Sequence, residues 1–436
     1  MKNFGFWTLT FLVVANMIGA GVFTTSGFAL ADLGSPWLVV VAWAIGGIIA
    51  VAGAFSYGLL VKRMPESGGE YLFLSRALHP SVGFIAGWVS LIAGFSGAIA
   101  FAATALESYV VGPRSLPSWL PAGSVAAASI VLASTVHGLR PRAGAWIQNA
   151  VVIAKLILLG SVLVFAATKI DVISQTHGSV PAESALSGWP LVAAMAGSLV
   201  WISLSYSGFN AAVYVAGEVN DAHRQVPRAL VAGTMVVVVL YVLLNAIFVY
   251  APSPESISGQ PDVAAIAARA LGGPWFENFV RWTIAACLLT SVFSMMMAAP
   301  RVYAKMADDG LMPAKLRFQG DSPVVATAVQ MVLAIALVAL SNLQGLLSYL
   351  GLTLSITAAC SVACLLLPSV RRKPVLHPVH WLPIAYVTCT LIAATILTVS
   401  DPWQIVGTAI TFLAGGIGYW VARSQMSATD RSNRGV

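Results

Sequence analysis

Two glycines interrupt the first long apolar stretch of this chain, at Gly19-Ala20-Gly21 within the run from Asn16 to Phe23. A backbone group that leaves the regular helix inside a bilayer has no water to bond, so such a break is tolerated only where it lines a cavity or a ligand. The N–H end of a broken helix can hold an anionic group, and unwound carbonyls can hold a cationic one. The break therefore favours a transporter, unless the glycines only allow close helix packing.

A second candidate break follows in the sixth apolar stretch. Between Trp201 and Asn210, the polar residues Ser203, Ser205 and Ser207 cluster at mid-span and Gly208 follows them. Broken helices at matching positions of two halves are typical of inverted-repeat transporters, which bind substrate near the membrane midplane. We therefore expect one repeat over residues 6–167 and a second over residues 187–368.

Lys155 is a lone ionisable side chain in the middle of the fifth apolar stretch. It lies about ten residues from either end, so at about 1.5 Å per residue its ammonium group does not easily reach either membrane surface. A lysine at this depth costs about 2.5 to 3.5 kcal/mol on insertion scales and usually faces a cavity or a partner. We interpret Lys155 as an ion-coupling residue; the alternative is a lysine permanently bound to carbonyls of the first span.

Other side chains bear on specificity. Asn210 can hydrogen-bond a substrate or a neighbouring helix, and Met295 offers flexible apolar surface for a pocket or for ordinary packing. Tyr206 could cover a substrate as an aromatic lid or belong to the general aromatic content of membrane helices. The carboxylates expected at membrane depth are Glu107 and Glu218, and neither is central. Without a central carboxylate, we expect a neutral substrate.

The elements that position these residues are apolar helices. Of 436 residues, 58% are hydrophobic and 9% are charged, whereas soluble domains carry about 25% charged residues. Because about 20 apolar residues cross the hydrocarbon core, we expect an all-α membrane protein that forms a single domain over residues 1–436, with no signal peptide. The expected spans are 6–31, 37–61, 82–111, 122–137, 145–167, 187–216, 229–251, 276–300, 323–341, 346–368, 380–399 and 403–422.

The distribution of basic residues predicts the orientation. With twelve spans, eighteen of the 23 Lys and Arg residues fall on the side that holds both termini. Since basic residues are retained in the cytoplasm, we expect both termini there and the protein in the inner (plasma) membrane. The net charge of +7 then reflects topology, so no nucleic-acid partner is expected.

Four motifs in sequence order resemble one known family. The first lies within span one, and the others follow spans two, six and eight. They read Gly19-Ala20-Gly21-Val22-Phe23, Pro65-Glu66-Ser67-Gly68-Gly69-Glu70-Tyr71, Gly217-Glu218-Val219-Asn220-Asp221 and Asp309-Gly310-Leu311-Met312-Pro313. This set is similar to the amino acid, polyamine and organocation (APC) transporter superfamily, and most of all to bacterial amino acid permeases related to the L-type amino acid exchangers. Spans eleven and twelve carry no motif.

The resemblance implies a LeuT-like fold with spans one and six broken, and an amino acid held at those breaks. The N–H groups of Ala20, Gly21 and Val22 would face its carboxylate, and the carbonyls of Met17, Ile18, Tyr206 and Ser207 would face its ammonium group. Gly19 and Gly208 would shape the breaks, with Asn210 and Met295 beside the substrate. In sodium-independent members a lysine at the place of Lys155 occupies the region where relatives bind sodium.

The expected function is thus sodium-independent transport of neutral L-amino acids by alternating access, through exchange or proton-coupled symport. A cationic amino acid or polyamine antiporter of the same fold is the closest alternative. A hydrolase would need a nucleophile with a base, or paired aspartates, inside the spans, and a channel would show a repeated filter; neither pattern occurs. No His, Asp or Glu stands near the four cysteines in sequence to complete a metal site, so we expect no bound metal. We also expect no cofactor and no enzymatic activity. The sequence does not predict the oligomeric state.

Overall fold

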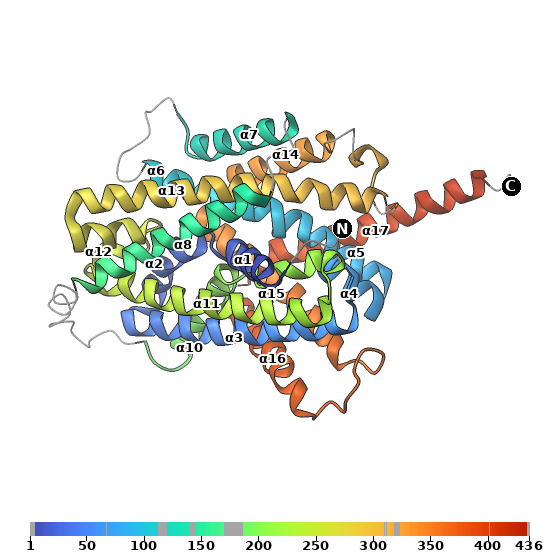
Figure 1. The fold of residues 1–436 in the computed structure, drawn as a ribbon, viewed down its shortest axis with the longest axis horizontal. Helices are drawn as coiled ribbons and strands as arrows, with labels where there is room; N and C mark the ends of the chain where they lie inside the picture. Colours follow the sequence, from blue (N-terminus) through green and yellow to red (C-terminus); the bar gives the residue numbers. More distant parts are fainter. Residues whose placement is uncertain are drawn as a thin grey trace.

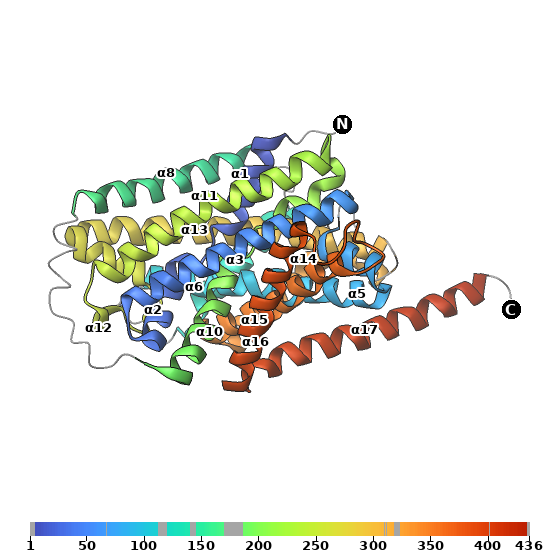
Figure 2. The same ribbon diagram turned by 90° about the horizontal axis from the view of Figure 1, so that it is seen from below.

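The computed structural model describes residues 5–66, 68–111, 120–139, 145–169, 186–308, 310, 312–317, 323–400 and 402–433. Across these ranges the chain is helical and contains no strand, as the apolar stretches predict. Long helices lie along the long axis of the molecule, with α2 and α12 toward one end and α4 and α5 toward the other (Figures 1 and 2).

The first half of the chain follows the predicted spans closely. The first break and a π-helical segment within the third span are the departures from regular helix. The elements are α1 (Phe6–Met17), α2 (Gly21–Leu33), α3 (Pro36–Arg63), α4 (Gly69–Ala77), α5 (Pro80–Val89), η1 (Ser90–Gly97), α6 (Ala98–Val111), α7 (Ser124–Leu139) and α8 (Ala145–Ala167).

In the second half, the break differs from the first one: the chain continues after it as a 3₁₀ helix rather than as an α-helix. The elements are α10 (Gly188–Ser205), η2 (Ala211–Glu218), α11 (Ala222–Tyr250), α12 (Pro254–Ile257), α13 (Val263–Asp308), η3 (Ala314–Leu316), α14 (Val324–Leu340), α15 (Leu343–Ala363), η4 (Cys364–Leu366), η5 (Pro378–His380), α16 (Trp381–Ser400) and α17 (Gln404–Asn433). The last helix runs beyond the predicted span, into residues expected to form a polar tail.

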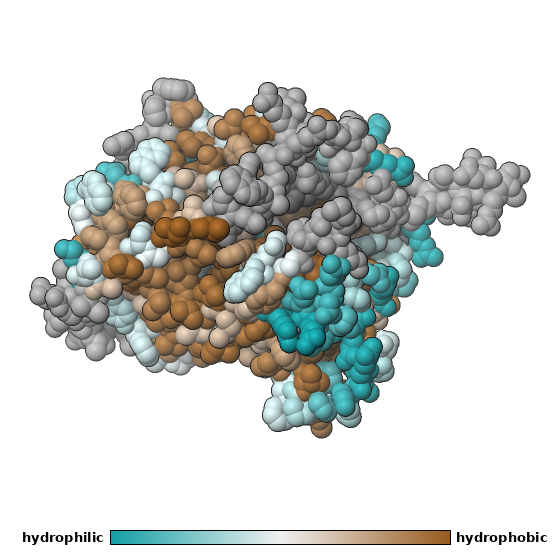
Figure 3. All heavy atoms as spheres, viewed as in Figure 1, coloured by the Kyte–Doolittle hydropathy of each residue, from teal (hydrophilic) through white to brown (hydrophobic). Residues whose placement is uncertain are grey.

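The helices are long and apolar enough for a membrane protein. Among the described residues, seven helices can each cross a bilayer, and α1 with α2 make an eighth if the bent pair forms one span. Shorter apolar helices cover 124–136, 153–167 and 324–340. Large apolar side chains face outward, including Ile157 and Val164, and the hydrophobic surface occupies the middle of the face in Figure 3. Lipid, rather than water, suits this surface.

Small residues let the helices that surround the breaks approach closely. An added Cβ at Gly58 of α3 would lie 2.9 Å from Pro227 Cβ of α11, and one at Gly46 would lie 2.5 Å from Ile202 of α10. Glycine at these positions permits backbone contact between membrane helices, where packing rather than water exclusion drives association. Helices α3, α10 and α11 thereby form one wall around the two breaks.

Candidate functional site

The first break separates α1 from α2 at residues 18–20, as predicted. The two helix axes differ by 42°. Ala20 precedes the first turn of α2 and no side chain caps it, so the N–H groups of this turn have no side-chain partner. At Gly21 a Cβ would lie 2.2 Å from Ser205 Oγ, and the Thr25 hydroxyl lies 3.0 Å from the same oxygen. The start of α2 is therefore held against the end of α10.

The second break faces the first. Helix α10 ends at Ser205, and turns lead through Gly208 to Asn210, where η2 begins. Gly208 has a φ of +95°, which favours glycine. A Cβ on Gly208 would lie 2.7 Å from the Asn16 carbonyl oxygen and 3.1 Å from the Met17 nitrogen. The last residues of α1, directly before the first break, are thus in direct contact with the second break.

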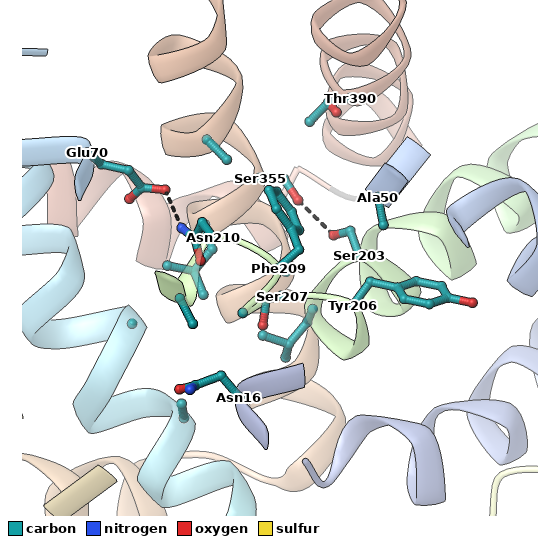
Figure 4. A pocket seen from close by; sticks show the side chains of 18 of the residues that line it. Asn16, Ala50, Glu70, Ser203, Tyr206, Ser207, Phe209, Asn210, Ser355 and Thr390 are labelled. Carbon is teal, nitrogen blue, oxygen red and sulfur yellow. Dashed lines mark hydrogen bonds between the residues drawn. The ribbon is translucent and has the colours of Figure 1, made fainter. Parts of the chain in front are cut away.

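A cavity of about 390 Å³ lies beside these segments. Its wall includes Tyr206, Ser207, Gly208 and Asn210 from the second break and Met295 from α13, all of them predicted site residues. Figure 4 shows Asn16, Ser207 and Asn210 around the same space. The remaining predicted residues do not line this cavity; these are Met17, Ile18, Gly19, Ala20, Gly21 and Val22.

Two residues that were predicted to contact substrate, Met17 and Tyr206, instead form hydrogen bonds within the protein. The Tyr241 hydroxyl donates to the Met17 carbonyl, which the resemblance assigned to an ammonium group. The Tyr206 hydroxyl donates to the Trp43 carbonyl at 3.2 Å, and its ring packs edge-on against Trp43. Tyr206 is 1% exposed, so its ring belongs to a packed aromatic group and its backbone borders the cavity.

The cavity reaches from the second break to α4. Helix α1 contributes Leu12 and Asn16 to its wall, η2 contributes Tyr214 and α4 contributes Glu70. Residues of α2 that do not line the cavity bond to neighbouring segments: the Tyr109 hydroxyl donates to the Phe23 carbonyl at 2.7 Å, and Gly259 donates its N–H to the Gly27 carbonyl at 2.8 Å.

Lys155 is buried, at 6% exposed, although its neighbour Ile157 on α8 is 68% exposed. Its ammonium group donates to Ser291 Oγ of α13 at 2.9 Å, and that hydroxyl donates to the Cys287 carbonyl at 3.0 Å. Within the described part of the chain, the hydrogen bond of Lys155 runs to a side chain of the eighth predicted span and not to carbonyls of the first. Lys155 therefore joins α8 to α13 through a chain of polar contacts.

Glu70 corrects the expectation that no carboxylate lies near either break. The sequence places it in a loop motif, whereas the structure places it in α4, 6% exposed and in the cavity wall. Its Oε1 atom accepts hydrogen bonds from the Tyr57 hydroxyl at 2.5 Å and from Asn210 Nδ2 at 3.3 Å. The two glycines before Glu70 are the sequence signal that could have indicated this position. Gly68 and Gly69 both have positive φ angles, and they turn the chain back toward the protein interior.

Glu107, one of the two expected carboxylates, does not line the cavity and instead binds backbone N–H groups of a neighbouring helix. Its Oε1 atom accepts the Gly123 N–H at 2.6 Å, and its Oε2 atom accepts those of Val125 and Ala126 at 2.8 and 3.0 Å. These bonds satisfy free N–H groups at the start of α7. The side chain of Glu218, the other expected carboxylate, lies outside the described part of the structure.

Glu107→Ala should therefore lower stability without altering substrate recognition. Loss of a helix cap costs about 0.5 to 2 kcal/mol, so we expect the melting temperature in detergent to fall by roughly 2 to 4 °C. Glu255→Ala is the matched control, since Glu255 is exposed in the first turn of α12. A large change in substrate affinity for Glu107→Ala with no loss of stability would contradict this assignment.

Several wall residues were not among the predicted site residues. Asn16 is the last polar residue before the first break, and the Phe209 ring packs edge-on against the ring of Tyr57 on α3. The Ser203 and Ser355 hydroxyls lie 2.7 Å apart and join α10 to α15, as Figure 4 shows. Serines and aromatics are common in membrane helices, so only the folded arrangement selects these residues.

Two broken helices in contact beside a cavity are the arrangement of a helical membrane transporter. The chain belongs to the amino acid permease family, because the family model described as "Amino acid permease" matches residues 4–421. This is a family of transporters and not of enzymes, and it confirms the resemblance in the sequence.

Individual relatives are more distant. The chain is 23% identical to the human large neutral amino acids transporter small subunit 2 over 80% of its own length and 66% of the relative, so it spans about two thirds of that protein. It is 25% identical to the serine/threonine exchanger SteT of Bacillus subtilis, over 78% of this chain and 77% of the relative. It is also 23% identical to the mouse b(0,+)-type amino acid transporter 1, over 96% of this chain and 88% of the relative.

Proposed function

We propose that this protein transports neutral L-amino acids of small to medium size without sodium, by alternating access. The observation that carries the proposal is the contact between the two breaks, with Gly208 against Asn16 and Gly21 against Ser205 beside the cavity. The names of the relatives, a large neutral amino acids transporter subunit and a serine/threonine exchanger, support this substrate class.

In the proposed bound state, the backbone recognises the amino and carboxylate groups of the substrate. The N–H groups of Ala20, Gly21 and Val22 stand at the positive end of α2 and would hold the carboxylate. The carbonyls of Tyr206 and Ser207 would hold the ammonium group, joined by those of Met17 and Ile18 once Tyr241 releases Met17. Asn210 and Met295 would contact the substrate side chain.

The proposal includes the topology. Twelve spans in one domain would hold two inverted repeats, 6–167 and 187–368, followed by two extra spans. Spans one, two, six and seven would rock against spans three, four, eight and nine. Both termini would lie in the cytoplasm and the cavity would open inward, since η2 and the end of α13 lead into basic residues, Arg224 and Arg228 at the start of α11 and Lys315 in η3.

A cationic amino acid or polyamine antiporter is the second candidate, and Glu70 favours it. A buried carboxylate in the cavity wall can pair with an ammonium or guanidinium group. The b(0,+)-type relative covers most of the chain. Against this candidate, both hydrogen bonds to Glu70 already come from protein groups, Tyr57 and Asn210.

Competition for uptake separates the two candidates. Proteoliposomes preloaded with an amino acid would be given labelled alanine together with unlabelled competitors in about hundredfold excess. Alanine, serine, threonine or leucine should reduce uptake about tenfold or more, whereas arginine, agmatine and putrescine should leave it nearly unchanged. If arginine or putrescine competes best, the neutral substrate class is wrong and the antiporter candidate is correct.

A further inference from the structure

Glu70 is an acidic group enclosed beside the second break. Its side chain leaves α4 and points toward Asn210, the residue directly before η2 (Figure 4). Tyr57 of α3 and Asn210 both donate to Oε1. Within the described part of the chain, the hydrogen bonds of this carboxyl group end on that one oxygen, which leaves Oε2 to take a proton.

The surroundings of Glu70 are neutral. The titratable side chains that face it are Tyr57 of α3, Tyr214 of η2, Tyr386 of α16 and Cys360 of α15. Helix α5, which packs on α4, has no titratable side chain. The ion pairs among the described residues do not include Glu70, and its neighbour Glu66 pairs instead with Arg76 at the surface. Burial raises the pKa of Glu70, because a low-dielectric site disfavours the charged form.

We propose that Glu70 binds and releases the proton that is coupled to amino acid transport, an inference that rests on the proposed function. The proton adds to Oε2 from water in the cavity and returns to water at the other side of the cycle, so no bond of the substrate is made or broken. The ionised carboxylate is the stronger acceptor for the Asn210 amide. Protonation weakens that bond and frees Asn210, and with it the start of η2.

This assignment links the proton to the moving part of the site. Gly69, beside Glu70, packs against the ring of Tyr214, since a Cβ there would lie 2.4 Å from Tyr214 Cε1. Helix α4 therefore contacts η2 through Gly69 and through the Glu70–Asn210 hydrogen bond. A proton is small enough for a carboxyl group that is 6% exposed, whereas a cationic side chain would have to displace Tyr57 or Asn210.

The test uses full-length protein in proteoliposomes, with Glu70→Gln, Glu70→Asp and the surface control Glu66→Gln. Counterflow of labelled alanine at equal pH on both sides measures amino acid transport alone. Net uptake with the acidic side outside, compared with equal pH, measures proton coupling. We expect about a fivefold or greater stimulation in the unmodified protein and in Glu66→Gln, and none in Glu70→Gln, which should keep measurable counterflow. Glu70→Asp should keep the stimulation with a shifted pH midpoint.

Each outcome decides the assignment. Absence of stimulation in the unmodified protein, or full stimulation in Glu70→Gln, would overturn it even if counterflow is normal. If Glu70→Gln does not fold, a pH midpoint in Glu70→Asp identical to that of the unmodified protein would overturn it as well. Loss of inhibition by putrescine in Glu70→Gln with the pH response intact would assign Glu70 to a cationic substrate instead. Loss of counterflow in every protein would reject the proposed function itself.

Discussion

Gly21→Val should abolish amino acid binding. A Cβ at residue 21 would lie 2.2 Å from Ser205 Oγ and 2.8 Å from Ser205 Cα, closer than real Cβ contacts come. The clash involves backbone, so α2 must move away from α10 and carry its N–H groups out of position. Because charge-assisted hydrogen bonds contribute about 1.5 to 3 kcal/mol each, losing two of them should weaken affinity by a hundredfold or more, measured by equilibrium binding of labelled alanine.

Gly19→Ala is the matched control within the same break. At Gly19 an added Cβ would have only the Met17 oxygen nearby, at 4.0 Å, so we expect affinity within about threefold of the unmodified protein. Gly21→Ala should fall between the two, since alanine meets the same Ser205 contact with less bulk. Unchanged affinity in a correctly folded Gly21→Val protein would mean that the binding site lies elsewhere.

Lys155→Met should reduce transport about tenfold or more while the protein still folds in the membrane. The substitution keeps most of the apolar stem but removes the charge and the hydrogen bond to Ser291. We propose that this fixed charge stands in for a coupling sodium ion. Replacing sodium with choline in the uptake buffer should therefore leave the unmodified protein unaffected.

Lys169→Met is the control for Lys155, because Lys169 follows the end of the same helix and is partly exposed. It should transport normally. Normal transport by Lys155→Met would make this lysine a structural link between α8 and α13. A severalfold loss of uptake in choline would contradict sodium independence whatever the lysine variants show.

The sequence predicted the helices well because their signal is local. An apolar run long enough to cross a bilayer leaves few alternatives to a helix, and span five was predicted at the observed bounds of α8. The breaks were predicted for a related reason: Gly19, Gly21 and Gly208 stand where a regular membrane helix has no need of glycine. Other boundaries differ by a few residues, and α17 continues to Asn433 because polar residues can extend a helix beyond the membrane.

The site was harder to predict because it depends on contacts between distant segments. Glu70 was read as part of a loop, since nothing in its neighbourhood shows that α4 packs back toward residue 210. Likewise, a lone glutamate in a span does not show whether it meets substrate or caps a helix 16 residues later, as Glu107 does. Lys155 was recognisable because a charge at mid-span is costly by itself, but its partner Ser291 was not.

The central claim is that a neutral amino acid binds where the two breaks meet. The most direct measurement is a structure of the protein with bound alanine, determined in a lipid nanodisc. The account predicts the carboxylate of alanine within about 3 Å of the N–H groups of residues 20–22 and its ammonium group at the carbonyls of Tyr206 and Ser207. Alanine bound away from both breaks, or paired through its ammonium group with Glu70, would contradict it.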